Sequence, residues 1–139
     1  MRGLALAGLA IAAVGVAAAC GDDEAANVCA EGAAVPDAPH VIPTEPAAGA
    51  VVGETFTVRG CSRTFESNVQ WRLSDPTGRV IARGFTMGGG VDGSAPFEIA
   101  VTADVAEPTL VELRVFEEDA SEGEGGPPPQ AVLPLLLMP

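Results

Sequence analysis

The sequence predicts an all-β domain, an immunoglobulin-like β-sandwich of about seven strands, which follows a signal peptide and a disordered spacer. Three observations support this fold class. Short runs of residues alternate apolar and polar side chains with a period of two, which is typical of half-buried strands. Turns rich in Gly, Pro and Asp separate these runs. None of the later segments has the apolar spacing of an amphipathic helix.

The first part of the domain is expected to contain one short and one longer strand. Apolar residues predict a short strand either near Val41 or at 51–52. In the longer strand Phe56 and Val58 share one face, while polar residues between them occupy the other. Gly60 is expected to end this run.

A β-hairpin is expected next. Val69, Trp71 and Leu73 alternate with polar residues, so Trp71 is expected in the core between the two sheets. The sequence Asp-Pro-Thr-Gly at 75–78 predicts a tight turn, and the apolar residues at 80–82 begin the return strand.

Three further strands complete the sandwich. Alternating apolar residues predict strands at 97–101 and 111–115, and the apolar run at 132–137 predicts the last strand. Pro134 has no amide hydrogen to donate, so one side of this last strand should be a sheet edge or a bulge.

The amino-terminal residues have the pattern of an export signal. A positively charged start is followed by apolar residues 4–16 and by small residues at 17–19. Small residues that run directly into a Cys resemble the lipobox of bacterial lipoproteins. The resemblance implies cleavage between Ala19 and Cys20 and lipidation of Cys20. The alternatives are an ordinary secretory signal cleaved nearby and an uncleaved anchor helix.

Lipidation would determine where the rest of the chain lies. Several acyl chains on Cys20 would hold the protein in the lipid bilayer, so the mature chain would lie on the extracytoplasmic face of the cell membrane. Residues 20–39 are rich in Ala, acidic residues and Pro, which predicts a disordered spacer. Cys29 and Cys61 remain as an even pair, and a disulfide between them is expected in this oxidising compartment. Two free thiols are the alternative.

Charge and composition exclude several classes of function. A net charge of −12 repels phosphate backbones, so no nucleic-acid partner is expected. His40 is the sole histidine and stands away from any nucleophile motif, so we expect no catalytic residue. The sequence has no recognisable set of zinc ligands, and neither a metal nor another cofactor is expected. The arginines that follow the signal are spread over several strands and are expected to pair with neighbouring acids.

Three loop segments could carry a function. Phe65 and Glu66 stand between two strands, where they either plug the sandwich or present a recognition tip, and a buried Phe with a surface Glu is the simpler interpretation. The acidic loop 117–124 could offer oxygen ligands to Ca²⁺, but its spacing does not match an EF-hand, which favours a solvated loop. The glycines at 88–90 predict a flexible hairpin loop.

A series of short motifs follows one another from His40 to Leu137: Val58-x-Gly60, Phe65-Glu66, Val69, Trp71, Asp75, Gly78, Val80-Ile81, Gly84-Phe85, Gly93, Phe97, Val115-Phe116-Glu117 and Leu133-Pro134-Leu135. Their order and spacing resemble the immunoglobulin-like domain of bacterial spore germination, a family that often accompanies GerMN domains in lipoproteins. This sequence has no GerMN domain, and residues 121–130 form a longer connection. The resemblance implies an immunoglobulin-like fold and no established reaction.

These features predict three parts: a lipoprotein signal peptide at 1–19, a lipidated Cys and acidic spacer at 20–39, and an immunoglobulin-like domain at 40–139. The domain is expected to be a non-catalytic binding or assembly module that meets an unknown protein or cell-envelope partner, with a role in spore germination or the cell envelope. The alternative is a cation-dependent adhesion or structural module that uses the acidic loop 117–124.

Overall fold

The computed structural model describes Cys29, residues 38–121 and residues 123–139. The predicted signal peptide, the lipidation site Cys20 and most of the spacer lie outside the described residues. Eight strands are present: β1 (His40–Glu45), β2 (Val51–Val52), β3 (Thr55–Arg63), β4 (Asn68–Ser74), β5 (Val80–Met87), β6 (Ala95–Thr102), β7 (Thr109–Phe116) and β8 (Gln130–Leu137). Within this described part the chain forms no helix, and so none that could cross a bilayer.

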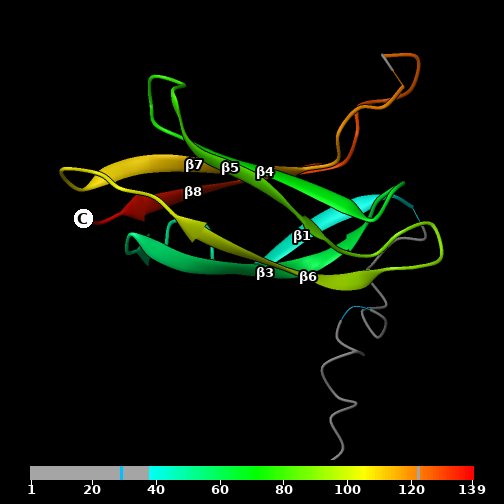
Figure 1. Ribbon diagram of the computed structural model, residues 1–139, viewed down its shortest axis with the longest axis horizontal. Helices are drawn as coiled ribbons and strands as arrows, with labels where there is room; N and C mark the ends of the chain where they lie inside the picture. The colour runs from blue at the N-terminus through cyan, green and yellow to red at the C-terminus, as the bar shows by residue number, and fades with distance from the viewer. Residues whose placement is uncertain (1–28, 30–37, 122) are drawn as a thin grey trace, which may run out of the picture.

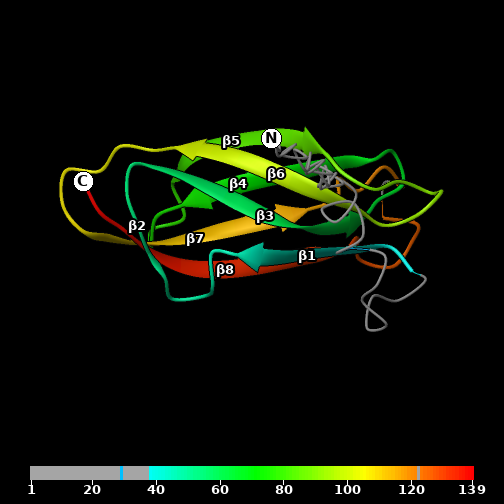
Figure 2. The same ribbon diagram turned by 90° about the horizontal axis from the view of Figure 1, so that it is seen from below.

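The strands form two sheets that pack face to face (Figure 1). One sheet has the order β1-β3-β6, and the other has the order β2-β8-β7-β4-β5. β1 lies beside β8 at one side of the sandwich, and β5 lies beside β6 at the other (Figure 2). The predicted immunoglobulin-like sandwich is therefore confirmed, with eight strands instead of about seven because both short amino-terminal segments form strands.

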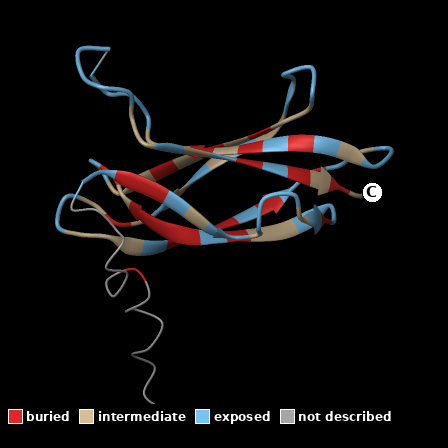
Figure 3. Cartoon of the chain, turned by 180° about the vertical axis from the view of Figure 1, so that it is seen from behind, coloured by how far each residue is buried: buried red, intermediate tan, exposed pale blue. Residues whose placement is uncertain are grey.

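The core lies between the sheets and is made by one face of each strand. Buried residues alternate with less buried ones along β4, β6 and β7, and the alternation of colours along the strands is visible in Figure 3. Trp71 is 8% exposed, so the prediction that it lies in the core is confirmed. The fully buried apolar core side chains are Val58, Val69, Leu73, Val101, Leu113, Val115, Leu135 and Leu137.

Gly60 does not end its strand, contrary to the sequence prediction. β3 continues through Gly60 to Arg63 and pairs with β1 and β6 along this stretch. A Cβ atom at Gly60 would overlap the carbonyl oxygen of Ile42 and the aromatic ring of Phe97. Glycine is required here because the neighbouring strand and the Phe97 ring approach the backbone closely, and not because the chain turns.

The disulfide between Cys29 and Cys61 is present, with a Cα–Cα distance of 5.5 Å. Cys61 lies on β3, and Cys29 is 3% exposed. The bond closes a loop with a sequence separation of 32. In the chain-entropy model, closing a loop of this length contributes about 3–4 kcal/mol to the free energy of unfolding. The disulfide thus connects the segment before β1 to the three-stranded sheet.

The predicted β4–β5 hairpin is also confirmed, and Asp75 organises its turn. The carboxylate of Asp75 accepts hydrogen bonds from the Thr77 hydroxyl at 2.6 Å and from the backbone amides of Thr77 and Arg79 at 2.9 and 3.1 Å. It also forms an ion pair of 3.0 Å with the guanidinium of Arg79. The hydroxyl of Thr77, followed by Arg79, lowers the pKa of Asp75 from 3.8 to about 2.

β8 has an exposed edge beside Pro134, as the sequence predicts. β7 pairs with the whole of β8, whereas β2 pairs with β8 only at Leu136 and Leu137. The carbonyl of Pro134 accepts a hydrogen bond of 2.7 Å from the amide of Gly49 on this second side. In a β-strand the nitrogen and the carbonyl of one residue point to the same side of the strand. The Pro134 nitrogen, which has no hydrogen to donate, therefore faces away from β7.

The two ends of the sandwich carry different loops. Residues 64–67, 88–94 and 117–129 lie at the end where β1 begins, and the last of these loops rises away from the sheets (Figure 1). The β4–β5 turn and the carboxyl terminus lie at the opposite end (Figure 1). The chain therefore enters the domain beside the three loops that include the predicted functional residues.

Candidate recognition site

Three loops meet at the end where β1 begins, and we call this end the tip. It comprises residues 38–39 and the loops 64–67, 88–94 and 117–129. Backbone hydrogen bonds join the first two loops: the amide of Thr64 donates to the carbonyl of Gly89 at 3.0 Å, and the amide of Gly88 donates to Ser67 at 2.8 Å. The first and third loops are joined through Phe65.

The side chain of Phe65 is 69% exposed, so its interpretation as a buried plug is wrong. Its backbone amide donates a hydrogen bond to the carboxylate of Glu117, at the end of β7. Ser67 completes the loop with a positive φ of 58°, which turns the chain sharply into β4. The aromatic ring is therefore held at the surface by a loop whose backbone is fixed at several points.

The glycines at 88–90 do not form a hairpin. β5 pairs with β4, and β6 pairs with β3, so this segment carries the chain from one sheet to the other. A Cβ atom at Gly89 would overlap the backbone of Ser62 and of Ala95, and one at Gly90 would overlap the Ser67 hydroxyl. The predicted hairpin loop is wrong because the glycines allow a tightly packed crossing between sheets.

The third loop is the long connection between β7 and β8. The amide of Glu117 donates to the carbonyl of Pro129 at 3.0 Å, which closes the base of the loop. Further out, Asp119 accepts hydrogen bonds from the hydroxyl and the amide of Ser121 at 2.7 and 2.9 Å. The Ser121 hydroxyl and amide lower the pKa of Asp119 below its usual value. The loop thus has internal structure of its own.

Phe65 lines two hollows at the tip. The larger, of about 620 Å³, lies between Phe65, Pro39 and the prolines at 127–129. The smaller, of about 280 Å³, is lined by Phe65, Glu66 and residues 117–120. The exposed side chain therefore borders both hollows.

The structure brings together two features that were separate in the sequence. Phe65 and Glu66 lie against the acidic loop 117–124, and both contribute to the smaller hollow. Phe65 and Glu117 are 52 residues apart, so no local sequence pattern could predict that they are close. The pairing of β4 with β7 brings them together. Within that loop, residue 122 lies outside the described part of the chain.

Two carboxylates of the tip accept hydrogen bonds from neighbouring loop residues. Glu117 accepts its hydrogen bond from Phe65, and Asp119 accepts from Ser121. No group of three potential metal-binding side chains converges anywhere in residues 38–121 and 123–139 or at Cys29. Glu117 and Asp119 therefore each cap a backbone amide of a tip loop.

His40 lies near a hydroxyl, which the sequence did not indicate. It is 6% exposed; its Nε2 lies 3.0 Å from Ser94 Oγ, and its Nδ1 lies 2.8 Å from the carbonyl oxygen of Ala38. A Ser–His pair can support catalysis only where a substrate reaches the hydroxyl. Neither hollow of the tip is lined by His40 or Ser94. The pair instead connects the start of β1 to the β5–β6 crossing.

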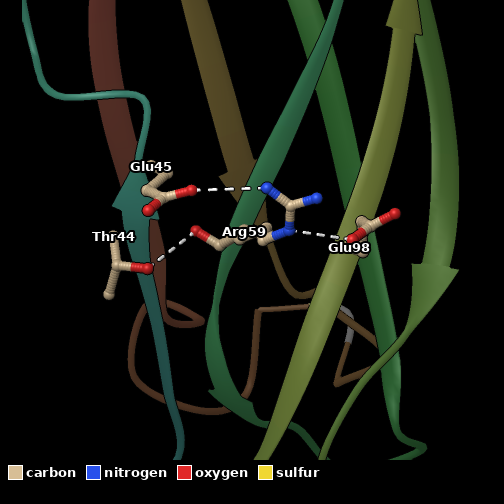
Figure 4. A network of polar contacts seen from close by, with 4 residues as sticks. All are labelled: Thr44, Glu45, Arg59 and Glu98. Atoms are coloured by element: carbon tan, nitrogen blue, oxygen red, sulfur yellow. Dashed lines mark hydrogen bonds and ion pairs between the residues drawn. The ribbon is translucent and has the colours of Figure 1, made fainter. Parts of the chain in front are cut away.

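Ion pairs between arginines and acids, as the sequence predicts, are seen among the described residues at Arg59, Arg79 and Arg114. Arg59 contacts Glu98 at 2.9 Å and Glu45 at 3.4 Å across the three-stranded sheet (Figure 4). Arg79 pairs with Asp75, and Arg114 with Glu112. Among the described residues, no ion pair is seen for Arg72 or Arg83, so for these two the expectation is wrong.

Comparison with known proteins agrees with this fold. The family described as the immunoglobulin-like domain of bacterial spore germination matches residues 41–124, which are more than half of the chain. The motifs noted in the sequence extend to Leu137. The family match is shorter and ends within the β7–β8 loop, before β8. No curated protein matches the chain. With its order of strands and this match over most of the domain, the chain belongs to the family of immunoglobulin-like domains of bacterial spore germination.

Proposed function

We propose that this chain is a lipid-anchored, extracytoplasmic protein whose immunoglobulin-like domain is a non-catalytic binding module, with Phe65 and Glu66 at the centre of its recognition site. The observation that carries this proposal is the exposed side chain of Phe65, which borders two hollows and whose backbone amide is held by Glu117. The family name connects such domains with spore germination, so a partner in the cell envelope is the first to test.

The exposure of Phe65 supports a role in binding. A large apolar side chain left in water forgoes about 1.5–3 kcal/mol that its burial would provide. Phe65 is 69% exposed, yet Thr64 beside it is 2% exposed and anchors the loop. A rigid aromatic ring loses little conformational entropy when a partner covers it, and such rings often dominate the energy of an interface.

The export of the chain is supported by two independent features. Residues 1–20 have the pattern of a lipoprotein signal that ends at Cys20. The disulfide between Cys29 and Cys61 is of the kind that persists in oxidising compartments. With Cys29 bound to β3, the chain from Cys20 to Cys29 spans at most about 30 Å, so the domain would remain close to the membrane.

Substitution at the tip tests the recognition proposal. Immobilised wild-type protein and the Phe65→Ala and Glu66→Ala variants would be exposed to a detergent extract of the cell envelope, and captured proteins would be quantified by mass spectrometry. We expect Phe65→Ala to reduce capture of the partner at least about tenfold, because it removes an exposed aromatic anchor. Glu66→Ala is expected to give a smaller loss.

Val51→Ala is the matched control. Val51 is 65% exposed but lies on β2, at the opposite end of the domain. It should leave capture unchanged, and all three variants should keep the melting temperature of the wild type. Equal capture by the wild type and by both tip variants would contradict the proposed recognition site.

A further inference from the structure

The outer face of the five-stranded sheet carries three arginines in a row. Strand register places Arg72 on β4 directly opposite Arg83 on β5 and directly opposite Arg114 on β7. All three point away from the core, because Trp71 and Leu73 beside Arg72 are buried. We call Arg72, Arg83 and Arg114 the arginine row.

A row of like charges is unfavourable in the isolated domain. Neighbouring strands lie about 4.8 Å apart, and like charges directly opposite each other destabilise a sheet. The chain has a net charge of −12, so acidic partners for arginines are abundant in its composition. Three positive charges are nevertheless placed side by side on one face.

The acids of the described chain leave much of the row unneutralised. Arg114 pairs with Glu112 at 3.2 Å, but its Nε is buried and has no hydrogen-bond partner among the described residues. The guanidinium of Arg72 lies 5.9 Å from the centre of the Phe116 ring. By contrast, Arg59 on the other sheet lies between two carboxylates (Figure 4).

Shallow hollows flank Arg72 on both sides. One, of about 430 Å³, is lined by Arg72, Arg83, Phe85, Phe116 and Glu118 among others. The other, of about 510 Å³, lies between Arg72, Arg114, Asp75, Glu112 and Leu110. Arg72 therefore contributes to both hollows and stands at the middle of the face.

Apolar side chains extend this face toward the sheet edge. Phe85 is 66% exposed and Met87 is 60% exposed, both on β5. β5 is an edge strand, because it pairs only with β4 in its sheet. Arginine, phenylalanine and methionine together are the residue types that are enriched where proteins bind one another.

We propose that the arginine row and the adjoining Phe85 and Met87 bind an acidic segment of a protein partner. Guanidinium groups bind carboxylates through paired, charge-assisted hydrogen bonds, and the exposed ring and thioether would cover apolar residues of the same segment. Because the rest of the domain is acidic, an acidic segment is repelled elsewhere and directed to this face. This site is separate from Phe65 and does not depend on the proposed tip.

The test uses a synthetic peptide of about 12 residues in which Glu-Glu pairs alternate with single Leu residues. Amide NMR of the disulfide-bonded domain would report binding and its location. We expect shifts at β4, β5 and β7, and an affinity that falls as salt is added. The double variant Arg72→Gln/Arg83→Gln should bind at least about tenfold more weakly, and Phe85→Ala a few-fold more weakly.

Arg59→Gln/Arg63→Gln is the matched control, since it removes the same charge from two arginines on β3, in the other sheet. It should change affinity by less than about threefold. If the two double variants lost peptide affinity equally, the proposal would be wrong, because the peptide would then be attracted by the positive charges of the domain in general and not by the arginine row. Absence of peptide binding would overturn it too, as would binding of inorganic polyphosphate in place of the peptide.

Discussion

At the residue scale, short polar side chains fix the turns and loops of this domain. Asp75 holds the β4–β5 turn through Thr77 and Arg79, and Asp119 holds the β7–β8 loop through Ser121. Both carboxylates have lowered pKa values, because hydrogen-bond donors favour their charged form. The stability of the turns should therefore depend on pH.

Asp75 is expected to stabilise the folded domain at neutral pH and to lose this effect in acid. Its pKa is lowered to about 2, whereas in the unfolded chain it is near 3.8, so between these values the unfolded state binds more protons. The contribution of Asp75 to the free energy of unfolding is complete above about pH 4 and is lost as the pH falls toward about 2. We expect Asp75→Asn to be less stable than the wild type at pH 7, with the difference closing across this range.

Urea unfolding at a series of pH values measures this difference. Glu107→Gln is the control, because Glu107 is exposed and no hydrogen bond to its carboxylate is seen in the described part of the chain. The free energy of unfolding of Glu107→Gln should equal that of the wild type at pH 7. A stability difference for Asp75→Asn that stays constant from pH 7 to pH 2 would contradict the assignment.

Some of these residue roles could be predicted from sequence, and others could not. The turn at Asp75 is recognisable because Asp, Pro and Gly occur at the positions that a tight turn requires. The exposure of Phe65 and the contact of His40 with Ser94 depend on loops that are distant in sequence. An apolar residue between two strands carries no signal of its own that separates a plug from an exposed tip.

At the element scale, the alternation of apolar and polar residues predicted where the strands lie, but not which strands pair with each other. The predicted strand positions are occupied by β3 to β8, and Pro134 correctly indicates an edge of β8. Glycine was the source of both errors at this scale. Gly60 lies within a strand, and the glycines at 88–90 lie in a crossing between sheets, because each one permits a close backbone approach that local sequence does not reveal.

The glycine crossing yields a stability prediction. In Gly89→Ala the new methyl group would overlap backbone atoms of Ser62 and Ala95, which cannot move aside as a side chain can. We expect a loss of about 1–3 kcal/mol in the free energy of unfolding, the range usual for overpacked sites. Denaturant unfolding of the disulfide-bonded domain provides the measurement.

Gly126→Ala tests whether the effect is specific to the crossing. A Cβ atom at Gly126 meets no atom within 4 Å, so this variant should retain the stability of the wild type. The account of the crossing would be wrong if Gly89→Ala and Gly126→Ala were equally stable.

At the scale of the whole molecule, the domain presents two different surfaces. The tip combines Phe65 with acidic residues, whereas the outer face of the five-stranded sheet carries the arginine row beside Phe85. The fold class and the disulfide could be predicted from strand periodicity and from the number of cysteines. The two surfaces could not, because each is assembled by strand pairing from segments that are far apart in the chain.

The location of the molecule is the central claim of the proposed function, and it depends on Cys20. A domain held by acyl chains on Cys20, with Cys29 bound to Cys61, would present the tip and the arginine row to partners at the outer side of the membrane. Both proposed binding sites then belong to one tethered module, and their partners are to be sought in the cell envelope.

The intact mass of the protein extracted from membranes, with and without reductant, tests this claim most directly. The account predicts the mass of residues 20–139 plus attached lipid, about 2 Da below the dithiol form until reductant is added. A mass that retains residues 1–19, or that includes no lipid, would contradict the lipid anchor.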